Sequence, residues 1–303
     1  MKQYPEQWKK SAVEFVSGGL AGFIEVALLH PLDLVKTRLQ LQTKPTKPSD
    51  PDHYNGIVDC FRKLRQTEGI LSFWKGNLPP LIVETPTKSV RFTTFHYCKK
   101  IFSVGQQPNL LAYMGSGYIA GTVESFVVCP FEVVKVTLQA DLSRATVAPS
   151  AWQMVKKIVQ EEGIFTKRGI YRGLGATIHV HNIYCGIYLG LFYRLKDIFP
   201  VYEARIHNTL VTLGLGIATS SCACFFNIPF DVVKSRIQAP QPKNIKYHNT
   251  FQSIKVVYNE EGWKSLYKGL GAKLLRLGPG GAIVIFIFEF VDNYLSSMFL
   301  ENQ

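Results

Sequence analysis

One ten-residue pattern occurs three times at a constant interval in this chain of 303 residues. PLDLVKTRLQ begins at Pro31, PFEVVKVTLQ at Pro130 and PFDVVKSRIQ at Pro229, so successive copies are 99 residues apart. Each copy is followed by a second pattern: EGILSFWKG (68–76), EGIFTKRGIYRG (162–173) and EGWKSLYKG (261–269). Two patterns repeated in the same order indicate internal triplication. We therefore predict three repeats, residues 1–105, 106–203 and 204–303, that form one domain.

The three repeats share one order of segments. In the first, a Gly-rich apolar stretch (17–30) precedes the proline pattern, and a polar stretch rich in Pro, Asp and Lys follows it. Residues 57–69 then place apolar side chains at helical spacing, which predicts a short amphipathic helix. A second long apolar stretch begins after the WKG sequence. Each repeat is thus predicted to hold two long helices and one short helix, which makes six long helices in an all-α protein.

The long helices are predicted to span a membrane. Residues 173–193 and 206–230 contain no Asp, Glu, Lys or Arg, and both exceed the ~20 residues needed to cross. Residues 101–123 are also free of charge, so hydropathy alone predicts about three spans. The equivalent stretches are interrupted by Glu25, by Lys88 and Arg91, and by Arg276, but the repeat predicts that they span as well. Ionisable residues in spans usually face a water-filled cavity.

Composition and motifs exclude several classes of protein. Charged residues make up 18%, below the ~25% of an average soluble domain, and the net charge of +12 fits lipid headgroups or nucleic acid as partners. The basic residues are spread over three repeats rather than gathered in one patch, which argues against nucleic acid. No dinucleotide, phosphate-loop or nucleophile–base motif is present, and the six cysteines form no C-x-x-C. We therefore expect neither an enzyme, nor a cofactor, nor a metal site.

The proline pattern places an acid two residues and a base five residues after each proline. If three copies surround a pseudo-threefold axis, each acid can pair with the base of a neighbouring helix. The predicted pairs are Asp33–Lys135, Glu132–Lys234 and Asp231–Lys36. The glutamines nine residues after each proline are placed to hydrogen-bond these pairs: Gln40, Gln139 and Gln238. The alternative is a solvated pair within each helix. A buried ring would act as a latch, because removal of one partner of a buried pair costs ~3–5 kcal/mol.

These motifs resemble those of the mitochondrial carrier family over essentially the whole chain. The resemblance implies a monomer with six transmembrane helices around a central cavity, in the mitochondrial inner membrane. It implies alternating access, with a matrix gate built from the ring above. One departure is Thr137, where a second basic residue is usual in the pattern.

The resemblance also implies cardiolipin at three helix starts, since N–H groups at a helix N-terminus bind phosphate. The residues are Trp74, Lys75 and Gly76, then Tyr171, Arg172 and Gly173, then Tyr267, Lys268 and Gly269. The alternative is a plain helix start with an interfacial aromatic residue. Small residues four apart, such as Gly117 and Gly121 or Gly216 and Ser220, are expected to let the odd helices approach their neighbours closely.

A cytoplasmic gate in this family would need an aromatic–acid–x–x–base sequence on each even helix. Here it is degraded to FHYCK (95–99), FYRLK (192–196) and FEFVD (288–292). Glu289 and Lys99 remain as one pair, with Lys196 left over. We therefore expect a weak gate on the cytoplasmic side.

The substrate site is predicted on the even helices, where residues depart from threefold symmetry. Glu84, Lys88 and Arg91 share one face of their helix, and His181, Tyr184 and Tyr188 share one face of the next. Arg276 is the only cation among the three equivalent positions 83, 180 and 276, and Arg can hold a carboxylate bidentately. The alternatives are an ion pair of Arg276 with Glu84 or Glu25, a packing role for His181, and a Lys88 that reaches the interface.

Two separated cations favour a dianion with a carboxylate at each end. The segments LLHPLDLVKTR, VETPTKSVRF, FNIPFDVVKSRIQ and KLLRLGPGGA resemble family members that exchange 2-oxodicarboxylates such as 2-oxoadipate and 2-oxoglutarate. Such members have Arg at the position of Val180, so the second anchor is lost here or has moved to Arg91 or Lys88. The alternative is an exchanger of other di- or tricarboxylates, such as malate or citrate, without keto-acid preference.

Overall fold

The computed structural model describes residues 4–43, 53–103, 109–142, 149–198, 205–241 and 245–277, with residues 280, 283, 287, 290, 291 and 294 beyond them. Its long helices are α1 (Tyr4–Leu41), α3 (Leu78–Phe102), α4 (Leu110–Ala140), α6 (Leu174–Ile198) and α7 (Arg205–Gln238). The short helices are α2 (Ile57–Thr67), α5 (Ala151–Glu162) and α8 (Thr250–Glu261), with 3₁₀ helices η1 (Ile70–Trp74) and η2 (Trp263–Tyr267). Residues 270–277 and the described residues beyond them are helical. The long–short–long order is confirmed in the first two repeats, and in the described residues of the third a long helix and a short helix are followed by helical residues.

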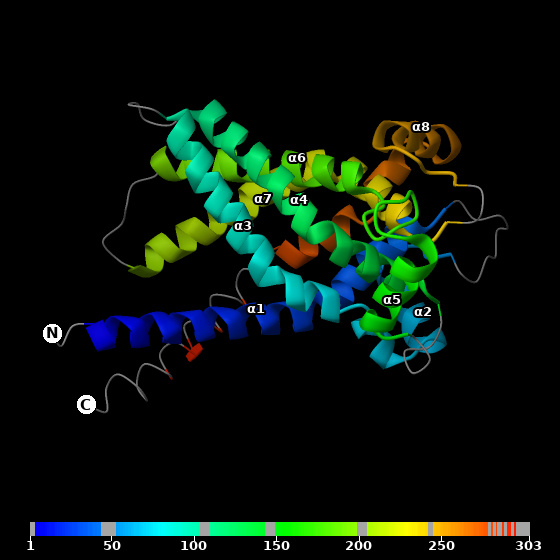
Figure 1. The fold of residues 1–303 in the computed structure, drawn as a ribbon, viewed down its shortest axis with the longest axis horizontal. Helices are drawn as coiled ribbons and strands as arrows, with labels where there is room; N and C mark the ends of the chain where they lie inside the picture. The colour runs from blue at the N-terminus through cyan, green and yellow to red at the C-terminus, as the bar shows by residue number, and fades with distance from the viewer. Residues whose placement is uncertain are drawn as a thin grey trace.

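The long helices run side by side along one axis of the molecule. Figure 1 shows α2, α5 and α8 gathered at one end, with the start of α1 at the other. In the described part, α3 packs on α4, α4 on α6, and α6 on α7, while α1 contacts α3, α4 and α7. The bundle therefore presents two different ends, one covered by short helices and one made of helix termini.

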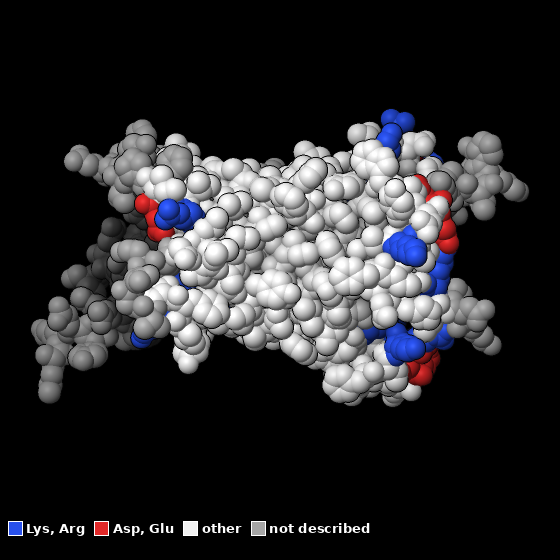
Figure 2. Space-filling model, turned by 90° about the horizontal axis from the view of Figure 1, so that it is seen from above, with Lys and Arg blue, Asp and Glu red and all other residues white. Residues whose placement is uncertain are grey.

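The surface matches a membrane protein. On the face shown in Figure 2, a broad band without charged residues separates Lys, Arg, Asp and Glu side chains at the two ends. In the described part, one helix, Thr209–Gln238, is by itself long and apolar enough to cross a membrane. The expectation of about three such stretches is therefore wrong. The charge-free stretch 101–123 is divided between α3 and α4, and histidines and Asn182 interrupt the apolar run of α6.

Each short helix is held by apolar side chains at the proline-pattern end of its own repeat. Leu34 and Val35 of α1 pack with Leu64 of α2. The same arrangement joins Val133 of α4 to Met154 and Ile158 of α5, and Val233 of α7 to Val257 of α8. Burial of these side chains away from water stabilises the position of each short helix. Three small cores thus replace one central core at this end.

The glycine that begins each even helix ties one repeat to the next. Gly76, Gly173 and Gly269 have φ of 69°, 76° and 81°, which side chains with a Cβ rarely adopt. A Cβ on Gly76 would lie 3.1 Å from the Lys135 carbonyl of α4, and one on Gly269 would lie 3.1 Å from the Lys36 carbonyl of α1. On Gly173 it would lie 3.1 Å from Ile237 of α7. The contacts run from repeat to repeat and close a ring.

Small residues bring only one odd helix into close contact among those described. A Cβ on Gly117 would lie 2.4 Å from the Cys185 carbonyl of α6, and one on Gly121 would lie 2.7 Å from the His181 carbonyl. At Gly22 and Gly216, the equivalent sites on α1 and α7, nothing lies within 4 Å. Close helix approach is therefore confirmed for α4, whereas at Gly22 and Gly216 no described residue lies that near.

Candidate functional site

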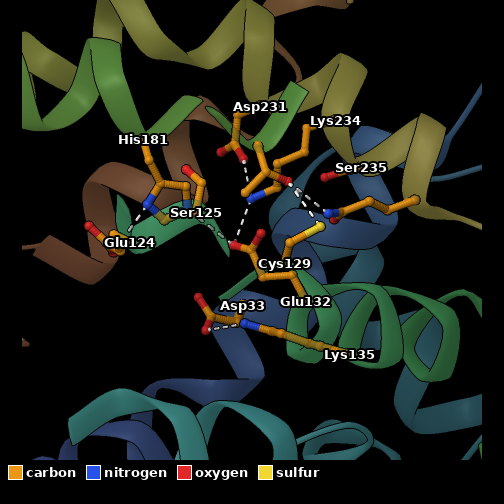
Figure 3. Close-up of polar contacts among 12 residues, drawn as sticks. Asp33, Glu124, Ser125, Cys129, Glu132, Lys135, His181, Asp231, Lys234 and Ser235 are labelled. Carbon is orange, nitrogen blue, oxygen red and sulfur yellow. Dashed lines mark hydrogen bonds and ion pairs between the residues drawn. The ribbon is translucent and has the colours of Figure 1, made fainter. Parts of the chain in front are cut away.

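Three inter-helix ion pairs lie at the end of the bundle that carries the short helices. Lys135 Nζ lies 2.9 Å from Asp33 Oδ2 and Lys234 Nζ lies 2.7 Å from Glu132 Oε1; Figure 3 shows both contacts. The third pair joins Lys36 Nζ to Asp231 Oδ2 at 2.6 Å. These are the contacts predicted from the proline pattern, and each crosses between repeats. Because the acids are buried or nearly so, the pairs hold α1, α4 and α7 together at this end.

The ring departs from threefold symmetry through additional contacts. Asp231 also accepts from Lys273 Nζ at 3.0 Å, and Lys234 lies 4.0 Å from its other oxygen. Lys273 was not anticipated from the sequence because the other repeats offer no equivalent cation. Each carboxylate in the ring has a second cationic or imidazole neighbour, since Asp33 lies 3.4 Å from Arg276 and Glu132 lies 3.6 Å from His181.

The glutamine prediction holds for one copy of three. Gln40 Nε2 lies 3.5 Å from Asp231 Oδ2, while its carbonyl accepts from Ser235. Gln139 instead lies 3.4 Å from His30 Nε2, and Gln238 donates to Thr177 at 3.0 Å. For Gln139 and Gln238 the expected bond to an ion pair is therefore wrong. All three glutamines pack their side-chain carbons beside the glycine of the preceding repeat, Gly269, Gly76 or Gly173, so this packing does not explain why Gln40 alone reaches the ring.

The cations of the WKG, YRG and YKG sequences point inward. The Lys75 side chain is 3% exposed and bonds Glu68 at 2.8 Å and the Asp141 carbonyl at 3.1 Å. Lys268 bonds Glu261 at 3.0 Å and the Gln42 carbonyl at 2.8 Å. These carbonyls follow the C-termini of α4 and α1, where a cation is favoured by the helix dipole. These cations therefore cap neighbouring helices, and lipid binding at the three helix starts stays a prediction.

In the second repeat, different residues supply the buried basic group and the helix cap. Thr137 stands where Arg38 and Arg236 bond Glu68 and Glu261 in the other repeats. Arg172 donates to Thr137 Oγ1 at 2.5 Å and to the carbonyl of Gln238, the last residue of α7, at 2.6 Å. Burial lowers the pKa of Arg172 to about 10, and the guanidinium stays charged at neutral pH. One arginine therefore serves both as the missing basic residue and as the cap.

The predicted substrate residues of α3 are already paired with carboxylates. Lys88 Nζ lies 2.7 Å from Glu84 Oε1, one turn away, and both side chains are partly exposed. Arg91 forms a two-pronged contact with Glu124 of α4, with Nε 2.6 Å from Oε2 and Nη2 on Oε1. On α6, Tyr184 and Tyr188 stack with ring centroids 5.5 Å apart, and Val180 is buried.

Glu124 is the central residue that sequence reasoning missed. The Glu124 side chain is 0% exposed. Its Oε1 also lies 3.1 Å from His181 Nδ1, and its Oε2 accepts from Cys185 Sγ at 3.6 Å. His181 therefore has no simple packing role. The available signal was a lone carboxylate in the apolar stretch GTVESF of a spanning helix, since such residues mark functional sites.

Arg276 lies between two acids of α1. Its Nη2 is 3.8 Å from Glu25 Oε1 and its Nε is 3.4 Å from Asp33 Oδ1. Of the two internal partners considered from the sequence, Glu25 is the one in reach, because Glu84 pairs with Lys88. The Arg276 side chain is 32% exposed, so it retains open surface for a further anion.

At the opposite end, Lys99 lies over aromatic rings. Its Nζ is 5.0 Å from the Tyr113 centroid and 5.5 Å from that of Tyr193. Glu289, its expected partner, falls outside the described residues. Lys196 is exposed, and no ion pair with it is formed by the described residues.

Comparison with known proteins assigns the family. The family model described as mitochondrial carrier protein matches residues 7–105, 106–203 and 207–299. The human mitochondrial 2-oxodicarboxylate carrier is 41% identical over 289 residues, 95% of each chain. Mitochondrial 2-oxodicarboxylate carrier 1 of Saccharomyces cerevisiae is 36% identical, and mitochondrial citrate transporter D of Aspergillus niger is 35% identical; the alignments cover 93% and 94% of each chain, respectively. This chain is therefore a member of the mitochondrial carrier family, a multi-pass protein of the mitochondrial inner membrane.

Proposed function

We propose that this carrier exchanges 2-oxodicarboxylates, such as 2-oxoadipate and 2-oxoglutarate, across the inner membrane by alternating access. The observation that supports it most is the similarity along nearly the whole chain to relatives named 2-oxodicarboxylate carriers. We therefore expect the protein to transport its substrates rather than to catalyse a reaction on them.

The second substrate anchor is Arg91 together with His181. Both side chains contact the same oxygen, Oε1 of Glu124, so both lie within reach of one carboxylate group. A substrate carboxylate therefore finds a guanidinium here although position 180 is Val. Arg276 is the other anchor, and the Tyr184 and Tyr188 rings line the space beside His181. Lys88 contributes less, because its side chain is 47% exposed and held by Glu84.

The ring of Asp33, Glu132 and Asp231 with their lysines is the matrix gate, and the three inter-helix ion pairs support this role. Lys99 forms the weak cytoplasmic gate together with the rings of Tyr113 and Tyr193. Cardiolipin binds at the three even-helix starts through backbone N–H groups, because the neighbouring cations are used internally. The transporting unit is the monomer.

A second candidate is exchange of citrate or malate without keto-acid preference. The similarity to a named citrate transporter favours it, at 35% identity over 94% of each chain. Citrate differs from the substrates of the first candidate by a third carboxylate, and malate differs from them by the absence of a keto group.

Uptake into proteoliposomes loaded with 2-oxoglutarate tests the proposal. We expect labelled 2-oxoadipate and 2-oxoglutarate to enter faster than malate or citrate. Arg276→Ala should lower the apparent affinity about 10–150-fold, the worth of ~1.5–3 kcal/mol for a bond to a charged group. Arg276→Lys should stay impaired, since Lys lacks the guanidinium fork. Lys157→Ala, on the exposed face of α5, is the control. Faster citrate uptake would favour the second candidate, and normal uptake by Arg276→Ala would refute the anchor.

A further inference from the structure

A chain of ion pairs connects the predicted substrate anchor to the matrix gate. It runs from Arg91 to Glu124, from Glu124 to His181, and from His181 to Glu132. It continues through Lys234 to Asp231 and ends at Lys36 and Lys273. Figure 3 shows His181 between Glu124 and Glu132. Side chains of α1, α3, α4, α6, α7 and the 270–277 helix thus form one buried charged network.

His181 contacts a carboxylate with each of its ring nitrogens. Nδ1 lies 3.1 Å from Glu124 Oε1, and Nε2 lies 3.6 Å from Glu132 Oε1. An ionised carboxylate only accepts hydrogen bonds, and a neutral imidazole has one N–H. Both contacts are favourable together only when both nitrogens carry a proton. The other charged neighbours are Arg91 on Glu124 and Lys234 on Glu132, so the two carboxylates are each shared between His181 and one permanent cation.

Counted over the described residues, the network carries an excess of positive charge. Its cations are Arg91, His181, Lys234, Lys36 and Lys273, and its carboxylates are Glu124, Glu132 and Asp231. With His181 protonated the excess is two charges, and with His181 neutral it is one. The adjoining pairs are balanced, because Arg276 and Lys135 face Glu25 and Asp33, and Lys88 faces Glu84.

Uncompensated charge is costly in a buried site. An anion with two negative charges neutralises the excess, whereas a trianion leaves one negative charge over. Val180 contributes to this balance, since an arginine at that position would raise the excess to three. Glu124 contributes as well, because its carboxylate cancels one cation of the network.

We propose that Glu124 and His181 set the charge selectivity of the carrier: Glu124 is a resident counter-anion, and the His181 proton supplies the second positive charge that matches a dianion. This rests on the proposed function, and it names the property by which the site distinguishes a dicarboxylate from citrate.

Competition between citrate and 2-oxoglutarate in proteoliposomes, at one fixed pH near neutrality, tests the counter-anion. Glu124→Gln raises the network excess to three, so the citrate to 2-oxoglutarate uptake ratio should rise about tenfold or more, the equivalent of ~1.4 kcal/mol. Glu124→Asp retains the charge and should leave the ratio unchanged. Val180→Arg adds a cation without removing a buried carboxylate, so it should shift the ratio in the same direction even if Glu124→Gln fails to fold.

The pH profile tests the proton. At limiting 2-oxoglutarate, wild-type exchange should fall as pH rises from about 6 to about 8, across the range in which histidine titrates. His181→Arg keeps the charge at every pH, so it should flatten the profile. His179→Gln should leave the profile unchanged, because His179, on the same helix, contacts the Gly175 carbonyl and the rings of Phe230 and Phe251 and pairs with no carboxylate among the described residues.

The outcomes separate the two proposals. A wild-type protein that exchanges no 2-oxodicarboxylate overturns the proposed function. A protein that does exchange it, but whose uptake ratio is the same in Val180→Arg and whose wild-type profile is flat, overturns the charge-selectivity inference alone.

Discussion

Replacing Lys36 in the matrix ring should lower the free energy of unfolding by less than the loss of one partner from an isolated buried ion pair would. Asp231 keeps Lys273 at 3.0 Å when Lys36 is lost, so its carboxylate stays paired. We expect Lys36→Ala to cost ~1.5–3 kcal/mol, the worth of one hydrogen bond between charged groups. In Lys36→Ala with Lys273→Ala, the nearest remaining cation is Lys234 at 4.0 Å. The double variant should therefore lose about a further 3–5 kcal/mol of unfolding free energy, the penalty for a buried charge without a partner.

The test is a double-mutant cycle on thermal stability in detergent. Buried cysteines such as Cys60, Cys129 and Cys224 provide the signal, since a thiol dye reaches them only on unfolding. The double variant should lose more than the sum of the single variants. Additive losses, or a Lys36→Ala loss as large as that of the double variant, would contradict a shared Asp231. Exchanging the charges, Lys36→Asp with Asp231→Lys, should not restore stability, because the new lysine would face Lys273 and Lys234.

The fold and the ring could be predicted because triplication constrains them. Any residue type that recurs at three equivalent positions must satisfy three similar environments, so the acid and base of the proline pattern could be paired before the structure was known. All three pairs, Asp33–Lys135, Glu132–Lys234 and Asp231–Lys36, are in contact.

The residues that were missed are those that break the symmetry. Lys273 has no equivalent in the other repeats, and Glu124 has one only in the first repeat, Glu25, so the threefold pattern did not predict their contacts, although Glu124 bonds Arg91 and Lys273 bonds Asp231. Burial was the other unseen quantity. The sequence places Lys75 and Arg172 at helix starts. Only the packing shows that Lys75 bonds Glu68, that Arg172 bonds Thr137, and that carbonyls at helix C-termini accept from both cations.

Three further predictions test packing, capping and acid sensitivity. Gly117→Ala should lower the melting temperature by several degrees or prevent folding, because its Cβ would lie 2.4 Å from the Cys185 carbonyl, whereas Gly216→Ala, with nothing within 4 Å, should fold normally. Thr137→Val should cost ~1.5–3 kcal/mol by thermal shift, since Arg172 loses a buried acceptor, and an unchanged melting temperature would contradict that role. The last concerns Glu261 of α8. Burial alone would raise its pKa, but hydrogen bonds from Arg236 and Lys268 outweigh burial and hold the pKa below its usual 4.5. A lowered pKa contributes stability that is complete above the unfolded value and is lost as pH falls through the folded one. Glu261→Gln should therefore melt earlier at neutral pH and lose less on acidification than the wild type. Glu260→Gln removes an exposed pair with Lys246, which is worth ~0–1 kcal/mol, so it should behave as the wild type in both respects; an equal loss in the two variants would show that burial of the Arg236–Glu261 pair does not matter.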